Sequence, residues 1–181
     1  MKLQVVALLG SSLMIGFAAV ADEEARPGFQ LEAVGLRYGF GEGGLSRDFE
    51  ELEGVAGFSL PWEWELGRGW ELSPRLELSL GSFGNDHATA VIGSAGAMFS
   101  LAPGKVPVAL DVGVGPTFLS EHEFVTRGVG SDFQIRSWFG LSWAPHDHVR
   151  LSYHFQHMSN GGLAGDNQGL NMHTFSIAWR F

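Results

Sequence analysis

Polar and apolar residues alternate along most of the chain from about residue 29 onwards. In the clearest segment, 70–83, four leucines occupy even-numbered positions, and Glu, Ser and Arg residues occupy odd-numbered positions. Successive side chains of a β-strand point to opposite faces. The pattern therefore predicts strands that have one apolar face and one polar face.

Eight segments of this kind, each of about ten or more residues, are separated by turns rich in Gly, Pro, Asn and Asp. They cover residues 29–40, 49–60, 70–83, 88–101, 106–118, 133–143, 148–158 and 171–181. The connections near 103 and 145 are short, whereas those near 45, 125 and 164 are longer. Short periplasmic turns and long outer loops are typical of outer-membrane proteins. The predicted fold class is all-β, an eight-stranded antiparallel transmembrane β-barrel.

The polar faces are expected to line the interior of this barrel, because lipid would contact the apolar faces. A soluble lipocalin-like barrel would have the opposite arrangement. Eight strands leave room for side chains but not for an aqueous channel, so we expect no pore. The charged residues expected to pair in the interior are Arg75, Glu77, Asp111, Arg136, Arg150 and Arg180.

The first residues have the features of a secretory signal peptide. Lys2 precedes an apolar run, and Ala19-Val20-Ala21 places small residues where a signal peptidase would cleave. We expect residues 1–21 to be removed, which leaves residues 22–181 as a single domain.

Composition excludes several classes of function. The chain has no cysteine, so disulfides and thiolate metal sites are excluded. The net charge of −9 argues against a nucleic-acid partner, which would require a basic surface. The sequence is 45% hydrophobic, yet its mature part has no apolar run long enough for a spanning helix. This combination favours a protein that is integral to the membrane through strands.

The segment 151–181 carries the candidate chemistry. His157 and Ser159 lie two residues apart and therefore point to the same face of a strand. Asn171 shares its face with the apolar residues that follow it, up to the C-terminal Phe181. At about 3.3 Å per residue, His157 and Asn171 both lie roughly 30 Å from the inner ends of their strands. Polar groups at that height on the lipid-facing side are costly, which indicates a functional site.

These three residue types form a nucleophile, a base and an orienting group. A serine hydroxyl is a poor nucleophile until a base takes its proton, and a neutral imidazole does so when its other nitrogen is held by an acceptor. The amide oxygen of Asn171 can be that acceptor. The backbone N–H of Gly161 and the side chain of Asn167 are candidates for an oxyanion hole.

Other readings of the polar positions remain open. A bare His-x-Ser-Asn run is often only a polar strand end, in which case the chain is a non-enzymatic structural barrel. His146-Asp147-His148 and Glu121-His122-Glu123 are expected to be solvated turn and loop residues rather than metal sites.

The C-terminal hairpin resembles the lipid A 3-O-deacylases of the PagL family. The resemblance rests on one short run, a second Asn-x-Gly pair and a third polar residue twelve positions after the serine: His157-x-Ser159-Asn160-Gly161, Asn167-x-Gly169 and Asn171. It extends more loosely to the whole mature chain through length and an eight-strand architecture.

The resemblance implies a reaction and a location. His157 would be the base and Ser159 the nucleophile, with Gly161 and Asn167 as oxyanion donors and Asn160 and Gly169 in support. The substrate would be the 3-hydroxyacyl ester at the 3-position of lipid A, in lipopolysaccharide of the bacterial outer membrane. No cofactor and no metal are implied, and a homodimer is also compatible.

Position 171 departs from the family pattern, which typically has Glu there. An Asn fixes the imidazole tautomer but carries no charge to stabilise the imidazolium, so activity could be shaped by His173 or Asp166. The run is also similar to outer-membrane phospholipase A, which uses Asn in this role, but whose barrel of about twelve strands is longer. The length of the chain favours the deacylase over a phospholipase A-like acyl hydrolase.

Overall fold

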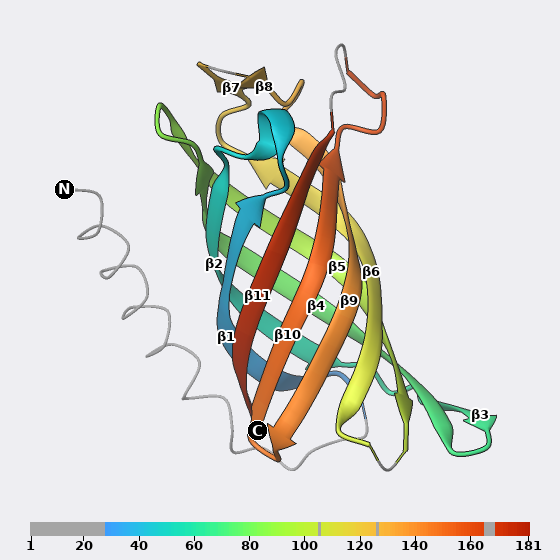
Figure 1. The fold of residues 1–181 in the computed structure, drawn as a ribbon. Coiled ribbons are helices and arrows are strands. Elements are labelled where there is room, and N and C mark those ends of the chain that lie inside the picture. Colours follow the sequence, from blue (N-terminus) through green and yellow to red (C-terminus); the bar gives the residue numbers. More distant parts are fainter. Residues whose placement is uncertain (1–27, 105, 126, 165–168) are drawn as a thin grey trace.

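The computed structural model describes residues 28–104, 106–125, 127–164 and 169–181. The expected signal peptide lies outside these ranges. Among the described residues, no helix is long and apolar enough to cross a membrane. The described part of the chain forms a closed antiparallel barrel (Figure 1).

Eight long strands form the wall of the barrel. They are β1 (Gln30–Gly41), β2 (Glu50–Ser59), β4 (Trp70–Gly84), β5 (Thr89–Pro103), β6 (Val108–Leu119), β9 (Phe133–His146), β10 (Val149–Ser159) and β11 (Leu170–Arg180). Each strand pairs with the next along the chain, and β1 pairs with β11 to close the ring. The predicted fold class is confirmed, and each expected strand differs from the observed one by at most three residues at either end.

The short elements lie at the two ends of the barrel (Figure 1). β3 (Trp64–Gly67) pairs with the start of β4 at the end that holds the C-terminus, which we call the inner end. The region 61–69, expected to be a turn, is therefore partly a hairpin extension. The 3₁₀ helix η1 (Gly44–Ser46), β7 (Glu123–Phe124) and β8 (Arg127–Gly128) lie at the opposite, outer end.

The turn expected at residues 144–147 is shifted, because β9 continues to His146 and the turn falls at Asp147 and His148. Pro145 is tolerated in this strand because it lies beyond the last pair that β9 makes with β6, Val108 with Trp143. A proline there removes no ladder hydrogen bond.

The alternation of faces follows the prediction. In β6, Val112 and Val114 are about half exposed on the outside, at 53% and 52%, whereas Asp111 of the same strand is 0% exposed in the interior. The same parity puts Leu36 of β1 and Phe139 of β9 outside. The outer wall is thus an apolar surface of the kind that contacts lipid.

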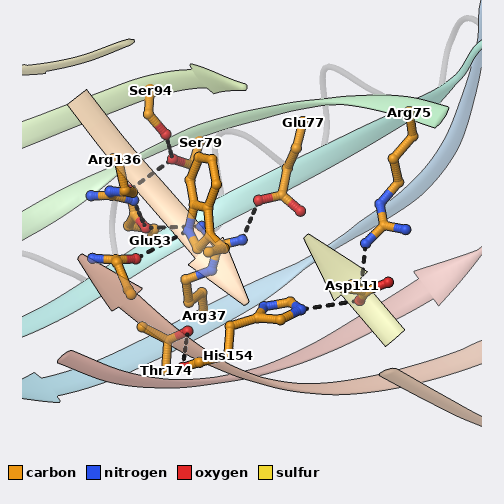
Figure 2. A network of polar contacts seen from close by, with 12 residues as sticks. Arg37, Glu53, Arg75, Glu77, Ser79, Ser94, Asp111, Arg136, His154 and Thr174 are labelled. Carbon is orange, nitrogen blue, oxygen red and sulfur yellow. Dashed lines mark hydrogen bonds and ion pairs between the residues drawn. The ribbon is translucent and has the colours of Figure 1, made fainter. Parts of the chain in front are cut away.

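The middle of the interior contains a network of ion pairs (Figure 2). Arg136 Nη1 lies 2.8 Å from Glu53 Oε2, and Arg37 Nη1 lies 3.3 Å from the same oxygen. Arg37 also pairs with Glu77. A buried charge is stable only when it is paired and hydrogen-bonded, so these contacts explain how a narrow barrel holds charged side chains.

A second group of interior ion pairs lies around Asp111. Its carboxylate accepts from Arg75, with Nη2 3.4 Å from Oδ2, and His154 Nε2 lies 3.0 Å from Oδ2 (Figure 2). Arg150 pairs with Glu32. Arg180, the remaining member of the predicted set, lies 3.9 Å from the same carboxylate through Nε and is partly exposed. The predicted pairing is therefore confirmed for the other five residues.

The outer end of the interior is apolar instead. Its buried cluster, which we call the outer apolar cluster, consists of Phe49, Phe83, Ala90, Ile92, Leu119, Phe124, Val129, Met158, Leu170 and Met172. Three of its rings contact one another at centroid distances of 5.1 to 5.5 Å. Since three members come from the ends of β10 and β11, burial of this cluster fixes the outer part of the C-terminal hairpin.

We expect Arg136→Met to destabilise the barrel by about 3–5 kcal/mol, because it leaves Glu53 and Glu51 buried without this partner. Arg47→Met, on an exposed residue of the first loop, is the matched control. Urea unfolding of the detergent-purified barrel, followed by the gel shift between folded and unfolded forms, measures the difference. Equal midpoints for the two variants would contradict the importance of the interior ion pairs.

Candidate active site

The site is built on the outer ends of β10 and β11. In the register of this pair, His157 is opposite Asn171 and Met158 is opposite Leu170. Met158 and Leu170 are each 1% exposed, inside the outer apolar cluster. Because neighbouring residues of a strand face opposite ways, His157 and Asn171 must lie on the outer surface. His157 is indeed exposed.

The imidazole and the carboxamide are in direct contact. His157 Nδ1 lies 2.7 Å from Asn171 Oδ1. An amide oxygen only accepts hydrogen bonds, so the neutral ring carries its proton on Nδ1. Nε2 is then left with a lone pair, as a general base requires.

Two hydroxyl groups share this face with His157. Ser159, the last residue of β10, lies two positions further out and is half-buried. Ser137 of β9 is directly opposite His157 in the β9–β10 register. Among the described residues, neither serine is hydrogen-bonded to the imidazole. Catalytic hydrogen bonds are often long without substrate and tighten when it binds.

The loop after Ser159 is shaped by an asparagine and glycines. Asn160 is buried, and its Oδ1 accepts from the backbone N–H of Gly162 at 2.8 Å while its Nδ2 donates to Ala164 O. Gly161 and Gly162 have positive φ angles, 63° and 76°, which favour glycine. This side chain therefore holds the turn that carries the Gly161 N–H. Asn167 lies outside the described residues.

Gly169 leaves room for the imidazole. A Cβ atom at this position would lie 2.8 Å from His157 Cε1 and 3.3 Å from Nε2. Its φ of 51° is also in the left-handed region. Any other residue here would push the ring, so this glycine keeps His157 in contact with Asn171.

A carboxylate that sequence reasoning missed lies next to Asn171. The backbone N–H of Glu42 donates to Asn171 O at 2.8 Å, and Asn171 Nδ2 donates to Glu42 Oε2 at 3.4 Å. Glu42 continues the outward parity of Tyr38 and Phe40 in β1. This outward parity, combined with the expectation that the first and last strands pair to close the barrel, could have predicted that Glu42 lies near Asn171.

The other charged groups considered near the site do not reach the amide. His173 bonds through Nδ1 to the hydroxyl of Tyr153, 2.9 Å away, in the next outward row toward the inner end. That row also contains the rings of Phe40 and Phe155. Asp166 lies outside the described residues.

The runs 146–148 and 121–123, which contain histidine and acidic residues, make contacts away from the site. His148 Nδ1 lies 3.1 Å from Arg180 O at the inner end, and its ring stacks on Trp179. In the outer loop, His122 is bonded to Asp132, and this bond raises the pKa of the imidazole. Among the described residues, no group of three His, Asp or Glu side chains is placed to hold a metal ion.

Comparison with known proteins agrees with this architecture. The family model described as Lipid A 3-O-deacylase (PagL) matches residues 53–180. Lipid A deacylase PagL of Bordetella bronchiseptica (strain ATCC BAA-588 / NCTC 13252 / RB50) is 25% identical over 170 residues, which is 90% of each chain. The crystal structure of the outer membrane enzyme PagL superimposes with a TM-score of 0.61 and 18% identity, over 81% of this chain and 97% of that one.

The family match covers well over half of the chain and includes both strands that carry the site. The resemblance seen in the sequence is thereby confirmed: the chain belongs to the lipid A 3-O-deacylase (PagL) family.

Proposed function

We propose that this protein is an outer-membrane esterase that removes the 3-O-linked 3-hydroxyacyl chain from lipid A. Membership of the PagL family supports the substrate and the location. The observation that carries the catalytic assignment is the 2.7 Å contact between His157 Nδ1 and Asn171 Oδ1 on the outer surface, with Ser159 next to it on the same face. Lipid A occupies that surface in the outer leaflet.

Ser159 is the nucleophile in this proposal. His157 Nε2 takes the proton of the Ser159 hydroxyl as Oγ attacks the carbonyl carbon of the ester. The resulting imidazolium keeps its Nδ1–H bond to Asn171 Oδ1. The carbonyl oxygen becomes an oxyanion, for which the Gly161 N–H and Asn167 are the proposed donors.

The intermediate collapses when the bond between the carbonyl carbon and the sugar oxygen breaks. His157 returns its proton to that oxygen, so the 3-hydroxyl group of lipid A is released and the acyl chain stays on Ser159. Water, deprotonated by the same imidazole, then attacks the acyl carbon; the bond to Ser159 Oγ breaks, His157 returns the proton to Oγ, and the 3-hydroxy fatty acid is released. Each step uses one proton carrier and no cofactor.

The outward position of the site fits a substrate that diffuses within the membrane. The row of rings just below the site, Phe40, Phe155 and Phe139, offers apolar surface for an acyl chain. Lateral diffusion brings the ester to the serine, and the substrate never has to enter the interior of the barrel.

We expect Ser159→Ala to lower kcat for lipid A deacylation by at least about 10³-fold, because no acyl-enzyme can form without the hydroxyl. The measurement is mass spectrometry of lipid A incubated with the purified variant. Ser137→Ala is the matched control, since it removes the other hydroxyl next to His157, and it should retain activity.

The same assay identifies the other outcomes. Loss of activity in Ser137→Ala but not in Ser159→Ala would assign the nucleophile to β9 and contradict the proposal. Release of fatty acid from phosphatidylethanolamine with intact lipid A would identify a phospholipase. Full activity of both variants would contradict Ser159 as the nucleophile, and no hydrolysis of either lipid by the unmodified protein would leave a structural barrel.

Gly169→Ala should lower kcat by about 10–100-fold, because the new methyl group displaces the imidazole by a fraction of an ångström to an ångström. Gly162→Ala is the control, because the φ of Gly162, 76°, is also in the left-handed region, but a Cβ atom there would have no atom within 4 Å. Steady-state rates on lipid A, with the gel shift as a check of folding, compare the two. Equal losses would show that backbone strain, not the position of His157, decides the effect.

A further inference from the structure

Glu42 is joined to the candidate triad through both its backbone and its side chain. Its N–H donates to Asn171 O at 2.8 Å, which extends the β1–β11 ladder by one residue beyond the Gly41–Met172 pair. Its carboxylate accepts from Asn171 Nδ2 at 3.4 Å. The two contacts place a negative charge on the far side of the amide from His157.

The carboxylate determines which way the Asn171 amide points. A carboxylate only accepts hydrogen bonds, so it favours the NH₂ end of the amide. The oxygen end is then directed at His157, whose Nδ1 lies 2.7 Å away. If the amide were reversed, its oxygen would face the carboxylate of Glu42 and its NH₂ group would donate to the imidazole. The ring would then have to carry its proton on Nε2, where it could not accept one from Ser159.

Glu42 also brings the charge that an asparagine lacks. Proton transfer from Ser159 creates an imidazolium at His157, and Asn171 can stabilise it only through a dipole. A carboxylate bonded to the far end of the amide polarises the amide and attracts the imidazolium.

The charged and titratable residues discussed on the neighbouring strands β2, β9 and β11 do not serve this role. Arg136, on the neighbouring strand β9, faces the interior, and Glu50 on β2 bonds to Tyr38. On β11, His173 is bonded to Tyr153, and on β9 the residue opposite His157 is the uncharged Ser137.

We propose that Glu42 is a positioning residue of the active site. It orients the side-chain amide of Asn171, and its negative charge, acting through that amide, stabilises the imidazolium of His157 during acyl transfer. This inference rests on the proposed function, since it assumes that His157 acts as the base for Ser159.

The test is Glu42→Gln in the full-length purified protein, with lipid A as substrate and product measured by mass spectrometry. We expect kcat to fall by about tenfold with KM nearly unchanged, because the substituted group is bonded to Asn171 and does not bind substrate. Loss of the carboxylate makes the imidazolium less stable. The acidic limb of kcat/KM, where His157 must lose its proton, should therefore move to lower pH by about half a unit.

A second background separates an electrostatic role from a structural one. The Asn171→Glu variant has a carboxylate at position 171, directly next to His157. The carboxylate of Glu42 would repel this new carboxylate. Glu42→Gln should therefore be neutral or raise kcat in that background. Glu50→Gln, which removes another carboxylate from the same outer surface without touching Asn171, is the control in both.

The outcomes distinguish the role of Glu42 from the esterase function. If Ser159→Ala is inactive but Glu42→Gln has the rate and pH profile of Glu50→Gln, the role of Glu42 is overturned while the esterase stands. Equal losses from Glu42→Gln in both backgrounds, without a shift of the acidic limb, would also overturn it. If Ser159→Ala stays active, the esterase proposal and this inference fail together.

Discussion

The pairing register of β10 with β11 is the constraint on which the rest of the site depends. A slip of one residue would turn every side chain of the hairpin to the opposite face. The register is held from inside, because Met158, Leu170 and Met172 are buried in the outer apolar cluster. The burial of these apolar side chains therefore decides that His157 and Asn171 meet on the outside.

The barrel separates two uses of polar residues. In the interior, charged side chains such as Arg136 and Glu53 pair with each other in the narrow space that eight strands enclose. On the outer surface, a short row of polar side chains lies at the height where the loops begin, above a wall that is largely apolar. Two contacts between described residues link Glu42 to Asn171 and Asn171 to Nδ1 of His157. A polar strand end that is merely solvated would not need this chain of hydrogen bonds.

Much of the fold could be predicted from the sequence, because period-two alternation marks a strand without any knowledge of its neighbours. The contact of His157 with Asn171 was also predictable, since both residues belong to one hairpin and their heights follow from counting along two strands. Glu42 was not, because its partner is 129 positions away and is met only when the first and last strands close the ring. The extension of β9 through Pro145 was missed for a related reason: it depends on where the pairing with β6 ends.

The central claim is that a serine hydroxyl on the outside of this barrel is activated by an imidazole that Asn171 holds. Reaction of the detergent-purified protein with an alkyl fluorophosphonate, followed by mass spectrometry of its peptides, tests this claim most directly, because only an activated serine forms the adduct. The account predicts one adduct, on Ser159, that disappears in His157→Ala. An adduct on Ser137, or labelling of Ser159 that persists without the imidazole, would contradict it.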